Sequence, residues 1–545
     1  ASLWSILTTP IGGGLRRNGS PRLRSLFVAS NEARRIAAIE RPPEADDLGL
    51  GAGLRPVQIQ ALTRIRDANG GLICAGVGHG KFLISILAPT VLQSKKALLL
   101  VPPALLQQTR DELAKWRKVY PVIDGLEIAS YSMLSTQQGR RLLLDLAPDL
   151  IVADEAHALR NMSTRTRRLI EYFKSAPACR FVALSGTMTA RSLKDFAHLS
   201  ELALRHNSPT PREFRPLRSW CRVVDVRPDE PPTAADYREI RPLTDKYQKT
   251  PRESFRERLR TCRGVVATRE SGYKGSLTCA PVSYDLAPAQ KKALENLDQL
   301  WRTPDGRDLC SAAEIARTRR QILTGYYTRW NPAPPPEYLA ARSIWSKAAR
   351  DYLSRNRSGL DSLGLVTKAA ERGEGSDALQ VAFKTWRPFK DYPEPPTIAV
   401  WLTGHVVDLA VELARTNKTP AILWSESPHI LEAIGDRLPC YGGGVEPDTS
   451  GTTSIALSRR AHGTGRNLQA FADNITIGLV PSGAIFEQLI GRTHRSGQTA
   501  DVVTLQYMSA RGVGVSKELA SLKRDSKYQE QITGNKTKIT LAQWI

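Results

Sequence analysis

A glycine-rich segment early in the chain has the residue types that bind phosphate. Residues 72–81 read Leu-Ile-Cys-Ala-Gly-Val-Gly-His-Gly-Lys, an apolar run that leads into glycines and a lysine. Glycines let backbone N–H groups turn toward phosphate oxygens, and a following helix adds the positive end of its dipole. We expect Gly78, Gly80 and Lys81 to contact phosphate groups. A glycine turn with a purely structural role is the alternative at this point.

Two adjacent carboxylates follow a second apolar run. Residues 150–153 are Leu-Ile-Val-Ala, and Asp154 and Glu155 come directly after them, with His157 two residues further on. Asp154 can hold Mg²⁺ through its water shell, while Glu155 can orient and deprotonate an attacking water. The alternative is that both acids cap the next helix and that His157 is an ordinary surface histidine.

Two arginines near the end of the chain have a spacing suited to phosphate chemistry. Residues 488–498 read Gln-Leu-Ile-Gly-Arg-Thr-His-Arg-Ser-Gly-Gln, so Arg492 and Arg495 are three apart. On a helix, side chains at this spacing lie on one face. Two guanidinium groups on one face can stabilise the charge that develops during phosphoryl transfer. A solvated basic helix is the alternative.

The elements that must position these residues follow an alternating pattern. Short apolar runs alternate with helix-like stretches in two separate parts of the chain, which is typical of βαβ units. The expected strands are 72–75, 97–101, 150–153 and 181–184, then 421–424, 454–457, 475–480 and 502–507. The predicted fold class is therefore α/β, with two lobes that each contain a parallel sheet.

A segment of different composition separates the two series. From about residue 205 to 395, proline-rich breaks alternate with basic, helix-favouring stretches, which we interpret as a helical insertion with linkers. The expected organisation is a basic arm over 1–50, a first lobe over 51–204, the insertion over 205–395, a second lobe over 396–511 and a basic C-terminal extension over 512–545.

Composition and charge indicate the partner class. The formal net charge of +23 and the pI of about 9.9 favour a polyanionic partner, above all nucleic acid. The seven cysteines are scattered without CxxC spacing, which indicates neither a zinc site nor a disulfide framework and favours a reducing compartment.

The sequence also carries information on localisation. No apolar run approaches the roughly 20 residues needed to span a bilayer, so no membrane partner is expected. We expect an intracellular protein, cytoplasmic or nucleoid-associated, or acting in an infected host cell if the chain is viral. Residues 1–31 contain four arginines and no acid, which favours a basic arm over an organellar transit peptide.

The motifs, taken in order, resemble those of superfamily 2 helicases. Residues 154–157 form the Asp-Glu-Ala-His box of that superfamily, and the specific resemblance is to the Swi/Snf-like branch of double-strand DNA translocases. In the first lobe, segments similar to the adenine-reading motif, the AxxGxGK phosphate loop, motif Ia, the SYxxL segment and motif III are 54–58, 75–81, 98–102, 130–134 and 183–187. In the second lobe, 461–468 resembles motif V and 488–498 resembles motif VI, QxxxRxxRxGQ.

This resemblance implies ATP and Mg²⁺ in a cleft between the lobes, with nucleic acid, double-stranded DNA above all, bound across both. The implied catalytic residues are Lys81, Asp154, Glu155, Arg492 and Arg495, with Asp154 as the metal ligand. The implied nucleotide contacts are Arg55, Gln58, Gly78, Gly80, Lys81, Gly465 and Gln488. The implied nucleic-acid contacts are Pro102, Tyr131, Thr187, Thr464 and Gln469, with Ser185 and Thr187 coupling the two sites.

Two departures from the family pattern affect these expectations. Phe82 stands where a hydroxyl normally binds Mg²⁺, and the segment 444–454 is shorter than the usual link between motifs IV and V. The first keeps open a catalytically weak or inactive helicase-fold clamp, and the second suggests a trimmed second lobe. A strand-separating DNA or RNA helicase shares the same core and is the other alternative. No nuclease constellation stands out in the sequence.

Overall fold

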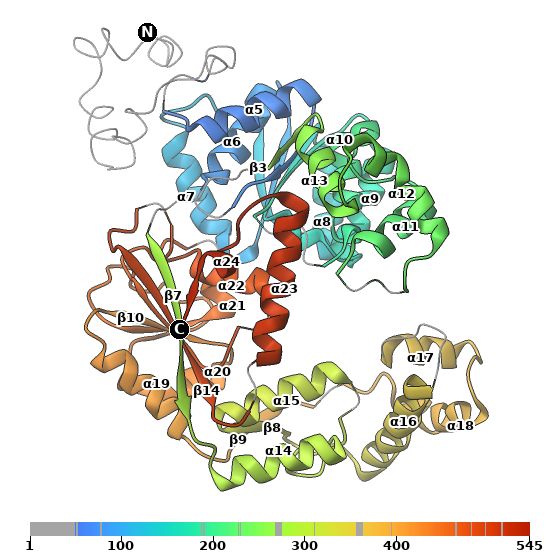
Figure 1. Cartoon of the computed structure of the whole chain (residues 1–545), viewed down its shortest axis with the longest axis vertical. Coiled ribbons are helices and arrows are strands. Elements are labelled where there is room, and N and C mark those ends of the chain that lie inside the picture. Colours follow the sequence, from blue (N-terminus) through green and yellow to red (C-terminus); the bar gives the residue numbers. More distant parts are fainter. Residues whose placement is uncertain are drawn as a thin grey trace.

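The computed structural model shows two α/β lobes, one above the other in Figure 1. It describes residues 50, 53–76, 79–186, 188, 191–226, 228, 230–267, 275–309, 311–355, 363–393, 395–463, 466–480, 482–495, 497–513 and 516–545. The arm expected over 1–50 therefore lies outside the described residues, apart from Leu50.

The first lobe is built on a six-stranded sheet in the order β3-β2-β4-β5-β1-β6, with every neighbouring pair parallel. The strands are β1 (Gly71–Cys74), β2 (Ala97–Val101), β3 (Leu126–Ser130), β4 (Leu150–Asp154), β5 (Arg180–Leu184) and β6 (Val265–Ala267). Helix α5 (Pro56–Ala68) precedes β1, and the helices that follow in this lobe are α6 (Lys81–Val91), α7 (Leu106–Trp116), α8 (Gln137–Leu146), α9 (Thr164–Ser175) and α10 (Ala197–Leu204).

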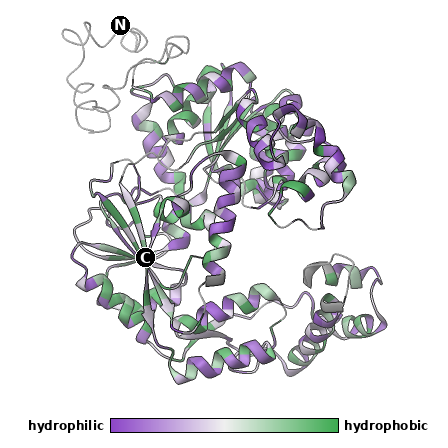
Figure 2. Ribbon diagram, in the orientation of Figure 1, coloured by the Kyte–Doolittle hydropathy of each residue, from purple (hydrophilic) through white to green (hydrophobic). Residues whose placement is uncertain are grey.

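The unbroken apolar runs of these strands have a simple explanation. Along β4, Ile151 and Ala153 enter one buried cluster while Leu150 and Val152 enter another on the opposite face of the sheet. A parallel strand covered by helices on both faces must be apolar at every position, which removes the alternation seen in half-exposed strands. Figure 2 shows hydrophobic residues concentrated in the strands and hydrophilic residues on the outer helices.

The second lobe is built on a seven-stranded parallel sheet in the order β11-β12-β10-β13-β14-β7-β15. Its strands are β7 (Ser276–Tyr284), β10 (Ala421–Ser425), β11 (Cys440–Tyr441), β12 (Ile455–Ser458), β13 (Asp473–Thr476), β14 (Val502–Ala510) and β15 (Gln543–Trp544). The strand expected over 475–480 is wrong in its limits, since β13 ends at Thr476. Gly478 has φ +88°, a conformation that no regular strand accommodates.

The segment 205–395 contributes to both lobes. Helices α11 (Phe214–Val224), α12 (Ala234–Tyr247) and α13 (Pro251–Thr261) pack on the first lobe, where Trp220 and Phe255 join the same cluster as Ile151. Strand β6 then pairs with β1, and β7 pairs with β14 of the second sheet.

Beyond β7 the same segment forms the lower part of the molecule in Figure 1. Helices α14 (Pro288–Leu300) and α15 (Ala312–Thr324) precede the antiparallel ribbon of β8 (Tyr326–Trp330) and β9 (Thr397–Trp401). Between these two strands, α16 (Pro336–Arg355), α17 (Leu363–Glu371) and α18 (Asp377–Trp386) form a small module around Trp345, Val366 and Phe383.

The end of the chain returns to the first lobe. After α19 (His405–Thr416), α20 (Pro428–Ile434), α21 (Arg459–His462) and α22 (Gly483–Ile490), the chain forms α23 (Ser516–Thr533) and α24 (Lys538–Leu541). Helix α23 runs alongside both lobes in Figure 1. Its Tyr528 hydroxyl donates to Asp225 Oδ1 over 3.1 Å, and its Asp525 pairs with Arg191 at 2.8 Å. Both partners belong to the first lobe.

The predicted fold class is confirmed, since the structure is α/β with two parallel sheets and many helices, consistent with two RecA-like lobes. Within the described ranges, every helix is too short or too polar to cross a membrane.

Candidate functional site

The glycine-rich turn joins β1 to α6 at the edge of the first lobe that faces the second. Gly80 is the N-cap of α6 with φ +70°, and a Cβ there would lie 2.3 Å from Nε2 of Gln58. Gln58 is buried and donates to the Gly80 carbonyl over 3.1 Å, while the backbone N–H of Arg55 donates to Gln58 Oε1 over 2.8 Å. The expected adenine-reading residues are therefore linked to the turn. Gly78 lies outside the described residues.

Lys81 connects this turn to the carboxylates. Its buried ammonium donates to the carbonyls of Ala75 and Gly76, each over 3.2 Å, and lies 3.8 Å from Oε1 of Glu155. Nδ1 of His79 lies 3.2 Å from the same Gly76 carbonyl. A lysine held by the backbone at the start of a helix is well placed to receive phosphate oxygens.

The two carboxylates lie at the end of β4 and differ in their protonation. Burial, together with the neighbouring charge of Glu155, raises the pKa of Asp154 to about 7. Burial also raises the pKa of Glu155, but Lys81, His157 and Arg492 outweigh it and lower this pKa below its usual range. Glu155 is therefore ionised near neutral pH, as a general base must be.

The backbone at this point holds an uncommon conformation. Glu155 has φ 54°, in the left-handed region that few non-glycine residues adopt, and its N–H donates to Asp154 Oδ1 over 3.0 Å. The hydroxyl of buried Tyr131 donates to the Asp154 carbonyl over 2.7 Å. The strand end that presents both acids is thus fixed by its neighbours.

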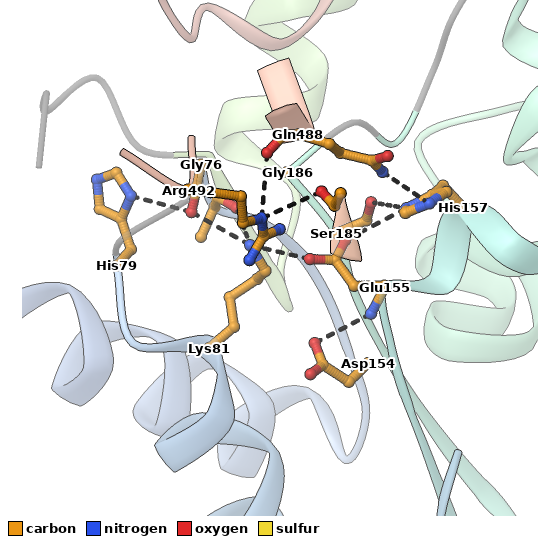
Figure 3. A network of polar contacts seen from close by, with 12 residues as sticks. Gly76, His79, Lys81, Asp154, Glu155, His157, Ser185, Gly186, Gln488 and Arg492 are labelled. Carbon is orange, nitrogen blue, oxygen red and sulfur yellow. Dashed lines mark hydrogen bonds and ion pairs between the residues drawn. The ribbon is translucent and has the colours of Figure 1, made fainter. Parts of the chain in front are cut away.

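His157 connects three motif segments (Figure 3). Its Nδ1 lies 3.3 Å from Glu155 Oε2 and 3.2 Å from Ser185 Oγ, and its Nε2 lies 3.0 Å from Nε2 of Gln488. Gln488 belongs to α22 of the second lobe. These contacts suit a neutral imidazole that donates from Nδ1 and accepts from Gln488 at Nε2. The reading of His157 as an ordinary surface residue does not hold.

Arg492 brings the second lobe to the carboxylates. It is buried, and its Nε donates to the carbonyls of Gly463 and Gln488 over 3.2 and 3.1 Å. Burial lowers its pKa to about 10, against the opposing effect of the Glu155 charge. Arg492 is still protonated at neutral pH, and Figure 3 shows it in the same cluster of side chains as Lys81 and Glu155.

The positive charge of Arg495 also lowers the pKa of Arg492, since the two arginines lie near each other. The helix expected to carry both arginines is wrong in its extent, since α22 ends at Ile490 and Gly491 is its C-cap. The two arginines are placed by the turns that follow the helix.

The expected nucleic-acid contacts have different environments. Pro102 and Tyr131 follow β2 and β3, so both lie at the edge of the sheet that carries Asp154. Pro102 is partly exposed, whereas Tyr131 is buried and its hydroxyl is bonded to the Asp154 carbonyl. Gln469 is partly exposed and its amide lies against Gly497. The expected nucleic-acid contacts Thr187 and Thr464 lie outside the described residues, as does the expected nucleotide contact Gly465.

The residues present fit ATP and Mg²⁺. Lys81 and the helix N-terminus suit phosphate, and a single carboxylate such as Asp154 is sufficient because Mg²⁺ keeps several waters and shares phosphate oxygens. Phe82 is the second residue of α6 and packs against the hydrophobic core. Ser85 is buried and its hydroxyl donates to the Phe82 carbonyl over 2.7 Å, so it does not replace the missing hydroxyl ligand.

Comparison with known families gives a match within the first lobe. Residues 52–190 match the family described as type III restriction enzyme, res subunit. This part of the chain is a helicase-like ATP-binding domain of the superfamily 2 type. The matched range contains Lys81, Asp154 and Glu155. A search of curated proteins finds no match to the chain.

Residues from the C-terminal extension also reach this region, and the sequence gave no reason to expect them. The Asn535 amide donates to the Cys74 carbonyl over 2.9 Å, although the two residues are 461 positions apart. Gln529 donates to the Gly186 carbonyl over 3.0 Å. Isolated polar residues in a basic segment carry no recognisable signal, so only their position in the fold reveals them.

Proposed function

We propose that this chain is an ATP-dependent nucleic-acid motor, most specifically a DNA-stimulated ATPase that moves along double-stranded DNA. The observation that carries the proposal is the meeting of Arg492 and Gln488, from one lobe, with Glu155 and His157, from the other. An ATP site completed only by both lobes allows hydrolysis to change the relation between them.

Each residue has a defined part in this proposal. Lys81 binds the β- and γ-phosphates, Glu155 orients and deprotonates the attacking water, and Arg492 with Arg495 stabilises the charge of the transferring phosphoryl group. Asp154 holds Mg²⁺, which supplies neutralisation of the phosphate charge when bound. Gln58 and Arg55, which are linked to the phosphate-binding turn, contact the adenine end of ATP.

The nucleic acid is proposed to lie across both lobes, with its backbone near Pro102, Thr187, Thr464 and Gln469. The net charge of +23 supports a polyanionic ligand. Ser185 precedes Thr187 by two positions in the sequence and contacts His157 at 3.2 Å, which supports coupling between the nucleic-acid and ATP sites. Contacts of this kind bind the backbone, so little sequence preference is expected.

One observation favours a second candidate, a helicase-fold clamp that binds DNA without turnover. Phe82 offers no hydroxyl, and the Ser85 hydroxyl is bonded within the helix. We rank the clamp second because Lys81, Glu155 and Arg492 lie together with the charges that hydrolysis requires.

The test is ATP turnover measured without nucleic acid and with single-stranded DNA, double-stranded DNA or RNA at equal nucleotide concentration. Stimulation at least about tenfold by double-stranded DNA over the other arms is expected. A Glu155→Gln variant is the matched control, because it keeps the size of the side chain and removes the base. Nucleic-acid binding without any turnover in the parent selects the clamp.

A further inference from the structure

The C-terminal segment from Gln529 to Ile539, here called the strap, contacts the catalytic motifs of both lobes. At its start, Gln529 and Asn535 donate to carbonyls of the first lobe. At its end, the Lys538 ammonium donates to the carbonyl of His494 over 2.8 Å and lies 3.1 Å from Nδ1 of the same residue. His494 lies between the two arginines proposed to act on phosphate.

Asn535 and Lys81, the proposed catalytic lysine, bind neighbouring carbonyl groups of the first lobe. Three successive carbonyls at the end of β1 are bound by side chains: Asn535 binds that of Cys74, and Lys81 binds those of Ala75 and Gly76. Asn535 is buried, and within the described part of the chain its side-chain amide has this one hydrogen bond. Its position is therefore defined by the end of the strand that enters the phosphate-binding turn.

Gln529 contacts a residue that packs against the same phosphate-binding turn. Gly186, whose carbonyl accepts from Gln529, packs so closely on the turn that a Cβ would lie 3.2 Å from the Ala75 carbonyl oxygen. The strap thus contacts the chain at the ends of both β1 and β5, which are neighbouring strands.

The second lobe is held by two contacts at the other end of the strap. Besides the bonds of Lys538 to His494, the N–H of Ile539 donates to Oε1 of buried Glu487 over 3.2 Å. Glu487 precedes Gln488, the residue that contacts His157.

The length of the strap gives these contacts a mechanical consequence. Asn535 and Lys538 are three residues apart, and three residues span at most about 11 Å when fully extended. The end of β1 and the arginine-bearing turns therefore cannot separate far unless one of the two anchors is released.

We propose that the strap sets the position of the phosphate-binding turn relative to Arg492 and Arg495, with Asn535 and Lys538 as positioning residues. This inference rests on the proposed function. Neither residue touches the reacting atoms, so their effect is exerted through Cys74 and His494. Loss of one anchor allows the arginines to withdraw from the transferring group, which lowers kcat while ATP binding through the first lobe is kept.

The first experiment compares Asn535→Ala and Asn535→Asp with the parent and with Lys536→Ala, whose side chain is exposed on the same segment. Stimulated ATP turnover is measured with active enzyme counted by nucleotide titration. We expect both Asn535 variants to lose about 3- to 10-fold in kcat, the range of one neutral hydrogen bond, with KM for ATP changed less than twofold. The aspartate keeps the shape and removes the donor, so parental kcat in Asn535→Asp overturns the proposal, as does a parental Asn535→Ala.

A second experiment distinguishes failure of the strap from failure of the proposed function. Hydrogen–deuterium exchange of the full chain without ligands is followed in peptides covering β1 and α22. Faster exchange in both peptides is expected for Asn535→Ala and not for Lys536→Ala. If the parent lacks ATPase activity, the proposed function fails and this measurement alone decides on the strap. Unchanged exchange in Asn535→Ala then overturns it.

Discussion

Nε2 of His157 lies 3.0 Å from Nε2 of Gln488, which follows it in the chain by 331 residues. Through this contact a histidine beside Glu155, the proposed general base, touches the helix that precedes Arg492. The same imidazole contacts Ser185, which precedes Thr187, a residue proposed to bind nucleic acid, by two positions in the sequence. We propose that occupancy of one site is transmitted to the other through these contacts.

Replacing Gln488 with alanine is expected to reduce stimulation by nucleic acid more than basal turnover. The variant removes the contact to His157, whereas Lys81 and Glu155 stay in place. We expect the ratio of stimulated to basal kcat to fall at least about fivefold, in line with the usual size of coupling free energies. Turnover titrated with double-stranded DNA measures this ratio.

His206→Ala is a suitable control for a companion His157→Ala variant, since His206 is exposed in the first lobe. A stimulation ratio that stays parental in both Gln488→Ala and His157→Ala would show that the nucleic-acid signal takes another route.

Arg492→Ala is expected to lower stimulated kcat by on the order of 100-fold or more, the range of an arginine that stabilises a transferring phosphoryl group. Arg492→Lys is expected to recover little, because an ammonium lacks the planar fork of donors. Pre-steady-state phosphate release reports the chemical step directly. The exposed Arg511 provides the control substitution to alanine. Parental rates in Arg492→Ala would remove this residue from the mechanism.

Phe82→Thr is expected to raise turnover, or to lower the Mg²⁺ concentration needed for half-maximal turnover, by a few-fold. A hydroxyl at this position can occupy one place in the Mg²⁺ octahedron. ATPase activity at saturating double-stranded DNA is measured over a Mg²⁺ titration, with Phe82→Leu controlling for loss of the ring. Equal responses of the two variants would show that metal ligation is not the cause.

Because buried His494 lies against Lys538, we expect the free energy of unfolding to depend on pH below neutrality. Burial, together with the charge of Lys538, lowers the pKa of His494 to about 4. The unfolded chain, with a histidine pKa near 6.5, therefore takes up the proton first as pH falls. The stability contributed by neutral His494 is complete above about pH 6.5 and is lost progressively down to about pH 4.

Thermal unfolding of the parent and of His494→Gln over this pH range isolates the effect. We expect the difference in midpoint temperature between the parent and His494→Gln to shrink as the pH falls, because glutamine does not titrate. A constant difference between the two midpoints from pH 7 to pH 4.5 would contradict the assignment of this titration to His494.

The affinity for nucleic acid is expected to fall steeply with salt. A chain of net charge +23 releases several counterions on binding a duplex, which gives a negative slope of log affinity against log salt. Unrelated duplexes measured at four salt concentrations should give similar slopes. A flat response would contradict a binding mode dominated by phosphate contacts.

The sequence alone determined the fold class and the local elements of the candidate site. The run 97–101 became β2 without change because five consecutive apolar residues between polar segments admit few other structures. The turn before Lys81 and the adjacent acids after β4 were likewise visible, since local spacing and chemistry identify them. For the first lobe, the family match over 52–190 agrees with this reading.

Long-range packing decided the rest. Three apolar residues at 265–267 do not show whether they complete the first sheet or the second, and only pairing with β1 settles it. The hydroxyl of Tyr131 could face solvent or the Asp154 carbonyl with the same local sequence. Asn535 looks like a surface residue until the chain places it at the end of β1. The periodicity of apolar residues shows which face of a helix or strand is buried. Which other element covers that face depends on contacts with residues hundreds of positions away in the sequence.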